Sequence, residues 1–102
     1  MILDLKGKLT AGLGDQILRE AIDELLAEEK KKVVLNLSEV SFLDSTGVGE
    51  LVAGLRTARR FGAHLKLLNV GERVYSTLDM ARLLPTFEIF RDEGEAVRSF
   101  EG

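Results

Sequence analysis

Strand-like and helix-like segments alternate along the whole chain of 102 residues, and this alternation restricts the possible folds more than any other feature. Short aliphatic runs are separated by longer stretches in which apolar residues recur every three or four positions. Such an order is typical of an α/β fold, in which helices pack on a central sheet. We predict a single domain, residues 1–102, with a mixed sheet of about four strands and about four helices, because this length suits one packed core.

The predicted strands are the short apolar runs. They cover residues 2–5, 33–37, 64–70 and 87–90. The run at 33–37 is almost continuously aliphatic, so we expect helices on both of its faces. Residues 38–43 are interpreted as a connection in which Val40 and Phe42 are apolar anchors.

The predicted helices follow these runs. The first begins after Asp15, whose carboxylate suits a helix N-cap, and ends near the lysines at 30–32. Three more are expected over 48–61, 72–83 and 93–100. Tyr75 and Met80 are interpreted as packing residues of the third helix, and His64 as a surface or packing residue.

Composition excludes several kinds of site. The chain has 17 acidic and 14 basic residues, one histidine and no cysteine. Disulfides and thiolate metal sites are therefore excluded, and a Ser-His-Asp triad is improbable. The mild acidity argues against a nucleic-acid-binding face. No apolar run approaches the ~20 residues of a membrane span, and the first residues lack the pattern of a secretory signal. We expect a cytoplasmic protein without metal or cofactor.

The segment Asp44-Ser45-Thr46-Gly47-Val48-Gly49 is the candidate functional site. It joins a buried strand to a helix, which in α/β folds is the functional edge of the sheet. The free amides of a helix start favour a phosphate, either bound or attached to a hydroxyl. The simpler alternative is that these residues only cap the helix. Against it, two glycines in a first turn cost ~1 kcal/mol each relative to alanine, and close approach of a partner is one explanation.

Other site types fit the chain poorly. A phosphate-binding P-loop motif is absent, and a receiver domain would need an acidic pair after the first strand, where Asp4 stands alone. No nucleophile and base can be paired, so an enzyme is not expected. Arg56, Arg59 and Arg60 follow the site along the same predicted helix, either as a solvated face or as contacts for an acidic partner.

Residues 33–49 closely resemble the signature of STAS domains, and within that family the anti-sigma factor antagonists. That signature is a hydrophobic strand, a short loop, and then Asp-Ser-Ser/Thr/Ala-Gly-Leu/Val-Gly at the start of a helix. The resemblance continues through residues 65–70 and the helix that holds Val74 and Leu78. It extends over nearly the whole chain and implies that residues 1–102 are one STAS domain.

The resemblance implies a regulatory binding protein and not an enzyme. The unphosphorylated antagonist binds an anti-sigma factor, a serine/threonine kinase of the histidine-kinase-like ATPase fold, and so releases a sigma factor for transcription. Phosphorylation of the hydroxyl before the first glycine ends this binding, and a phosphatase restores it. The matching hydroxyl is Thr46, and Ser45 is a secondary candidate. The expected partner-binding residues are Asp44, Ser45, Thr46, Gly47, Val48, Gly49, Glu50 and Arg56.

The same resemblance leaves a second role open. STAS domains also serve as non-phosphorylated scaffolds or subunits of transport, lipid-trafficking or stress-signalling complexes. Family members usually carry a further short strand before the one at 2–5, so we expect a sheet that lacks one edge strand. A monomer is expected, with dimerisation through this N-terminal edge as the alternative.

Overall fold

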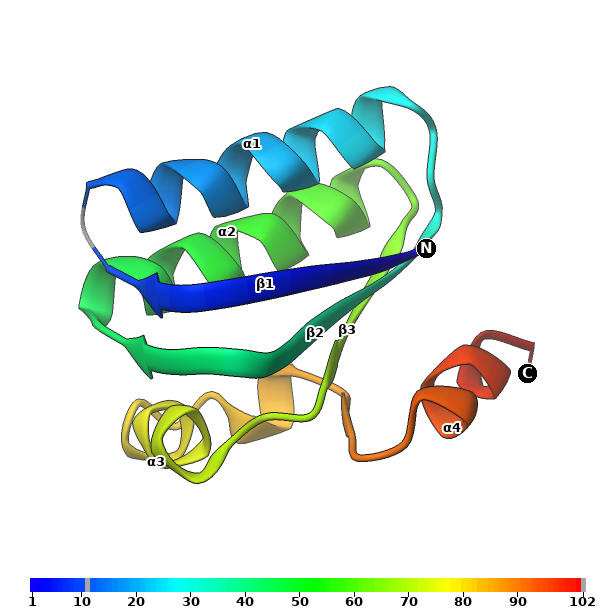
Figure 1. Cartoon of the computed structure of the whole chain (residues 1–102). Helices are drawn as coiled ribbons and strands as arrows, with labels where there is room; N and C mark the ends of the chain where they lie inside the picture. Colours follow the sequence, from blue (N-terminus) through cyan, green and yellow to red (C-terminus); the bar gives the residue numbers. More distant parts are fainter. Residues whose placement is uncertain (11, 102) are drawn as a thin grey trace.

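Four strands and four α-helices alternate along the part of the chain that the computed structural model describes, residues 1–10 and 12–101, the side chains of residues 13–15 excepted (Figure 1). The strands are β1 (Ile2–Leu9), β2 (Lys32–Leu43), β3 (His64–Leu68) and β4 (Ile89–Phe90). The helices are α1 (Leu13–Ala27), α2 (Ser45–Arg60), α3 (Glu72–Met80) and α4 (Glu93–Arg98). Short 3-10 helices, η1 (Leu84–Thr86) and η2 (Ser99–Glu101), follow α3 and α4. The predicted α/β class and number of elements are confirmed.

The strands lie in the sheet in chain order, β1-β2-β3-β4. All three pairings in the described part of the chain are parallel, so the prediction of a mixed sheet is wrong. The reason lies in the connections. Each strand is followed by a helix that returns the chain to the starting end of the sheet, and such a crossover makes the next strand parallel.

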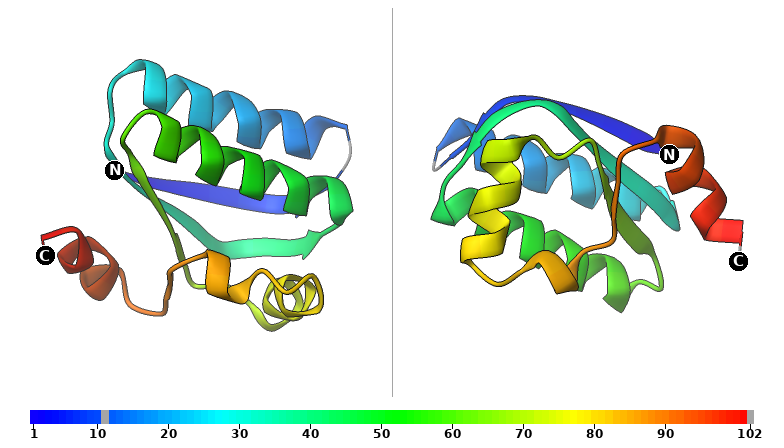
Figure 2. Two further views of the ribbon diagram at one scale, coloured as in Figure 1. Left: turned by 180° about the vertical axis from the view of Figure 1, so that it is seen from behind. Right: turned by 90° about the horizontal axis from the view of Figure 1, so that it is seen from below.

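Helices cover both faces of the sheet. Helices α1 and α2 lie side by side on one face, and α3 and α4 lie on the other (Figures 1 and 2). The predicted burial of strand 33–37 follows from this arrangement, since Val33, Val34, Leu35 and Leu37 are all at most 2% exposed. A large apolar cluster joins both helical layers, and a smaller one, centred on Val34, Leu68 and Ala96, lies under α4.

Strand β2 is longer than predicted. Residues 38–43 are not a connection but the second half of this strand, where Glu39 pairs with Lys6 and Leu43 pairs with Leu9. Helix α1 begins at Leu13 with Gly12 at its N-cap, so Asp15 lies in the first turn and is not the cap. The Asp15 side chain itself lies outside the described part of the structure.

A buried lysine connects the C-terminal segment to the sheet. Lys66 in the middle of β3 is 5% exposed, and its Nζ donates a hydrogen bond to Ser99 Oγ at 2.7 Å. The same ammonium lies 4.3 Å from the centre of the Phe100 ring and 3.4 Å from Glu88 Oε2. These contacts satisfy a charge that burial would otherwise destabilise.

Candidate functional site

The junction between β2 and α2 is held by hydrogen bonds from both sides. Asp44 is the N-cap of α2, and its carboxylate accepts a hydrogen bond from the Gly47 amide at 2.8 Å. The backbone N–H of Asp44 donates to Leu9 O at 3.3 Å, and the Val48 N–H donates to Asp44 O at 2.9 Å. The start of α2 is therefore fixed to the end of β1.

Gly47 brings the helix into direct contact with the sheet. A Cβ at this position would lie 2.0 Å from Leu9 O and 2.7 Å from Leu43 Cδ1, so only glycine fits. Gly47 is thus explained by packing inside the chain and not by the approach of a partner. Gly49 differs, because no described atom beyond its chain neighbours and the nearby backbone of α2 lies within 4 Å of the Cβ it would carry.

Ser45 and Thr46 are exposed in the first turn of α2. Asp44 supplies the side-chain cap, and among the described residues neither hydroxyl takes part in a hydrogen bond. Capping alone therefore accounts for Asp44 but not for the two hydroxyls beside it. Two accessible nucleophilic oxygens lie at the positive end of a helix, where added negative charge is favoured.

The remaining predicted residues fall into two groups. Val48 is half-buried against the main core, and the side chain of Glu50 is 12% exposed and paired with Arg19 of α1. Arg56 is exposed but lies ten residues after Thr46, which is about 15 Å along the helix. The structure therefore brings residues 44–50 together and places Arg56 apart from them.

Several exposed apolar side chains were not predicted, and two of them line the same hollow. Phe42, at the end of β2, is 39% exposed, and Met80, at the end of α3, is 86% exposed. Both line an open hollow on the α3 side. Tyr75 is 46% exposed as well, so the interpretation of Met80 and Tyr75 as packing residues is wrong. The helical periodicity of the sequence indicates the exposure of Met80. The buried positions of α3 are Val74 and Leu78, one turn apart, and Met80 lies on the opposite side of the helix.

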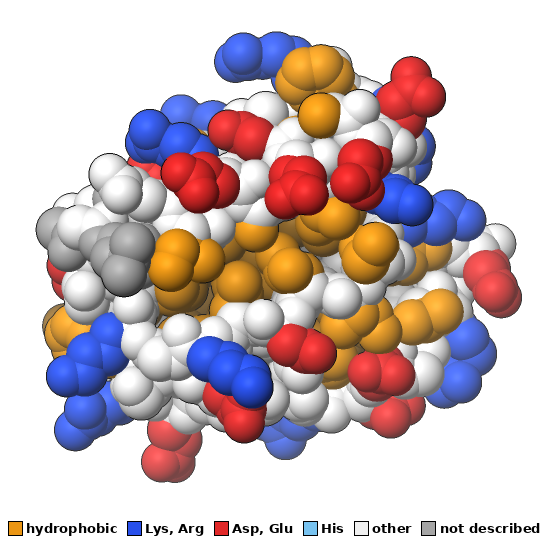
Figure 3. All heavy atoms as spheres, turned by 45° about the horizontal axis from the view of Figure 1, so that its top comes forward, with side chains coloured by type: hydrophobic (Ala, Val, Ile, Leu, Met, Phe, Trp, Pro, Cys, Tyr) orange, Lys and Arg blue, Asp and Glu red, His pale blue; other side chains and the backbone are white. Residues whose placement is uncertain are grey.

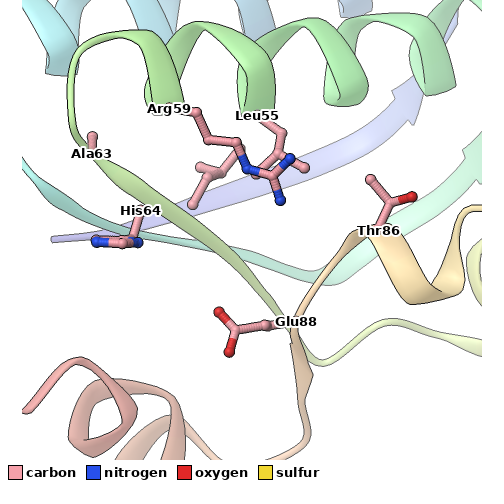
Figure 4. Close-up of a pocket in the computed structure, with 7 residues that line it drawn as sticks. Leu55, Arg59, Ala63, His64, Thr86 and Glu88 are labelled. Atoms are coloured by element: carbon pink, nitrogen blue, oxygen red, sulfur yellow. The ribbon is translucent and has the colours of Figure 1, made fainter. Parts of the chain in front are cut away.

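The C-terminal end of α2 carries basic side chains and not a pair of exposed hydroxyls. Figure 4 shows Arg59 reaching toward a small cavity of about 60 Å³ that His64, Thr86 and Glu88 also border. This volume admits a few water molecules. His64 is exposed there, at the start of β3.

No group of three or more His, Cys, Asp or Glu side chains among residues 1–10 and 12–101 is placed to hold a metal ion. None of the helices formed by these residues has both the length and the apolar character to cross a membrane.

Comparison with known proteins gives the family. The STAS domain model matches residues 1–96. The anti-sigma-B factor antagonist of Listeria monocytogenes is 30% identical over 78 residues, which cover 76% of this chain and 68% of that protein. An anti-sigma factor antagonist from Mycobacterium paratuberculosis superimposes with a TM-score of 0.86 at 20% identity, covering 99% of this chain and 85% of that one.

A second solved structure, the Bacillus cell-fate determinant SpoIIAA in its phosphorylated form, superimposes with a TM-score of 0.72 at 22% identity. The coverage is 97% of this chain and 88% of SpoIIAA. The family match spans nearly all of the described strands and helices, and the Asp44–Gly49 segment lies inside it. The chain therefore belongs to the STAS domain family.

Proposed function

We propose that this chain, acting as one domain, is an anti-sigma factor antagonist controlled by phosphorylation of Thr46. In its unphosphorylated form it binds an anti-sigma factor that is a serine/threonine kinase of the histidine-kinase-like ATPase fold. The single observation that carries the proposal is the exposed Thr46 hydroxyl beside the capped and closely packed start of α2. The names of the related proteins support the general role. We propose a cytoplasmic monomer as the working form.

In the proposed switching step, Thr46 Oγ attacks the γ-phosphorus of ATP held by the kinase. The new O–P bond forms as the bond to the ADP oxygen breaks, and the hydroxyl proton passes to a base of the kinase. A phosphatase reverses the modification by hydrolysis. Ser45 is also exposed and is retained as the secondary acceptor.

A phosphate at Thr46 is expected to break a complex without unfolding the domain. It adds a charge of about −1.5 to −2, which the helix amides offset by up to ~2 kcal/mol. The Asp44 carboxylate opposes it by roughly 3 kcal/mol per charge pair at about 6 Å and an effective dielectric of about 20. Water screens this repulsion in the free protein. A docked partner removes that water, and an uncompensated buried charge costs roughly 3–5 kcal/mol.

The proposed docking surface is the exposed part of residues 44–50, extended by Arg56. Phe42, two residues before Asp44, is exposed as well, but it lines the hollow on the α3 side and is not part of this surface. Arginines are among the groups that most often anchor protein interfaces.

The test uses the anti-sigma kinase encoded by the same organism. We expect the intact mass of the wild-type protein to rise by one phosphate group after incubation with kinase and ATP, and no rise for Thr46→Ala. If Thr46→Ala is still modified while Ser45→Ala is not, the acceptor is Ser45. If neither residue gains a phosphate, switching by phosphorylation is wrong for this chain.

The exposed α3 side supports a second candidate, a STAS scaffold or a subunit of a transport, lipid-trafficking or stress-signalling complex. Met80 and Phe42 line a hollow on the sheet face opposite α1 and α2, and such a surface suits docking that does not involve Thr46. The two candidates differ in one measurement: a scaffold of this kind retains its partner in Thr46→Glu and loses it in Met80→Glu.

A further inference from the structure

An ion pair links α1 to the first turns of α2. Arg19 Nε donates to Glu50 Oε2 at 3.1 Å, and Arg19 Nη2 donates to Glu50 Oε1, so the contact is bidentate. The Glu50 side chain is 12% exposed, whereas the Arg19 side chain is 64% exposed. The carboxylate is therefore held in place between the helices, and the guanidinium keeps access to solvent.

This pair lies on the same side of α2 as Thr46. A cleft between the helices is lined by Arg19 from α1 and by Glu50, Ala53 and Thr57 from α2. Thr46 precedes Glu50 by four residues, so it extends this line of side chains by one turn. Residues at this spacing have Cβ atoms about 5–6 Å apart.

The two helices are too closely packed for this arrangement to change freely. A Cβ on Gly54 of α2 would lie 2.5 Å from Ile22 Cδ1 of α1. The backbones that carry Arg19 and Thr46 therefore keep their relative positions. For Arg19 to reach Thr46, its long side chain, which is 64% exposed, has to rotate while the backbone stays in place.

The acidic side chains near Thr46 disfavour a phosphate there unless a cation lies close to it. Seen from the α1 side, the surface carries acidic side chains beside an apolar band (Figure 3). Glu20, Asp23 and Glu24 of α1 are exposed, and Asp23 lines the cleft itself. A phosphate on Thr46 would add its charge beside Glu50 and this acidic face. An arginine can bind phosphate oxygens in the bidentate geometry that it uses for carboxylates.

We propose that Arg19 is the residue that responds to phosphorylation of Thr46: its guanidinium turns from Glu50 to the phosphate and neutralises part of its charge. This inference rests on the proposed function, since it needs a phosphate at Thr46. The phosphate on α2 would then be bound by a residue of the same chain that belongs to α1. Glu50 then loses a partner, so the surface offered to a binding protein changes at two positions, Thr46 and Glu50.

The test installs phosphothreonine at position 46 by genetic encoding, so no kinase or partner is required. The second ionisation of the phosphate, near pH 6 for a free phosphothreonine, is followed by ³¹P NMR. We expect Arg19→Gln to raise this pKa by at least about half a unit relative to the wild-type chain, because a nearby cation favours the dianion. Arg19→Lys keeps the charge but not the bidentate geometry, and is expected to fall between the two.

Two matched variants complete the experiment. Arg56→Gln removes the same charge from the exposed surface of α2 and is expected to leave the phosphate pKa unchanged. Glu50→Gln removes the competing carboxylate and is expected to lower it. Equal values for Arg19→Gln and Arg56→Gln overturn the proposal, and so does a rise in Glu50→Gln. Thermal unfolding of each variant checks that the fold is retained. Failure of the kinase assay leaves this measurement unaffected, so the two proposals fail separately.

Discussion

Helix α2 begins and ends in different ways. At its start, a side-chain cap from Asp44 and the contact of Gly47 with Leu9 O fix the backbone, while the hydroxyls of Ser45 and Thr46 are exposed. At its end, the Phe61 N–H donates to the carbonyls of Thr57 and Ala58, and the Gly62 N–H donates to Arg59 O. Arg59 and Arg60 in the last turn are exposed, and Phe61 is 55% exposed.

The difference shows that only the start of this helix combines a fixed backbone with exposed hydroxyl groups. The first turn has a fixed backbone and accessible oxygen atoms, so the proposed modifying enzyme would meet them in one geometry. The last turn carries basic side chains that suit the negative helix end and could be exchanged with little consequence. Substitutions at the start of α2 should therefore change function or stability strongly, and substitutions at its end should change them weakly.

The largest effect is expected for a permanent charge at Thr46. We predict that Thr46→Glu weakens binding to the anti-sigma factor by about 100-fold or more, because docking would bury an uncompensated charge. Isothermal titration calorimetry measures the affinity, and circular dichroism should give an unchanged melting temperature. Thr46→Gln is the neutral control of similar size. Equal affinities for the two variants would contradict the role given to charge.

The next effect concerns the packing of the first turn. Gly47→Ala is predicted to lower the free energy of unfolding by about 3 kcal/mol or more, because the added Cβ meets backbone of β1 at 2.0 Å. Gly49→Ala is the matched control, with open space at its Cβ, and should raise stability by up to about 1 kcal/mol. Urea denaturation of both variants measures the difference. Similar stabilities would show that α2 can shift away from Leu9.

A smaller effect is expected when the cap is removed. Asp44→Ala should lower the free energy of unfolding by about 1–2 kcal/mol, because the Gly47 amide loses its acceptor. Asp44→Asn keeps a capping oxygen and should recover most of this loss. Arg60→Ala, at the other end, should change stability by less than about 0.5 kcal/mol. Chemical denaturation ranks the three, and an Arg60→Ala loss as large as that of Asp44→Ala would remove the contrast between the two ends.

The smallest effect is predicted for Arg56, which lies between the two ends. If it contributes a charge at the rim of the interface, Arg56→Ala should slow association by a few-fold at low salt and by less at high salt. Arg60→Ala, further along the helix, should not change the rate. Surface plasmon resonance at two salt concentrations measures both. An unchanged rate for Arg56→Ala would restrict the interface to residues 44–50.

Local patterns predicted most of the fold, and the exceptions have a structural cause. The helices and strands follow from apolar spacing, but the second half of β2 was interpreted as a connection. Its buried residues Leu37, Val40 and Leu43 are three apart instead of two. The pairing with β1 shifts register between Asp4 and Lys6 and again between Gly7 and Lys8, and β2 holds an extra residue at each shift. Bulges of this kind remove the alternation by which a strand is recognised.

The candidate site also has features that local sequence patterns predict and features that they do not. Asp44, Ser45 and Thr46 are adjacent in the sequence, so their grouping at a helix start was predictable. The reason for Gly47 was not, because it depends on contact with Leu9 in another strand. Arg19 was missed as well: it is 31 residues from Glu50, and an ion pair between two helices leaves no periodic signal in either. Met80 was misjudged although its position relative to Val74 and Leu78 indicates exposure.

The order of the strands also has a consequence for how the molecule forms. Since each strand pairs with the next one in the chain, every strand–helix–strand unit is built from consecutive residues. Residues 1–60 contain β1, β2 and both helices of one sheet face, including Leu9 and Gly47. Contacts close in sequence form faster than distant ones. We therefore expect the Thr46 turn to take its shape together with residues 1–60 during refolding, without waiting for β4 and α4 to pack on the sheet.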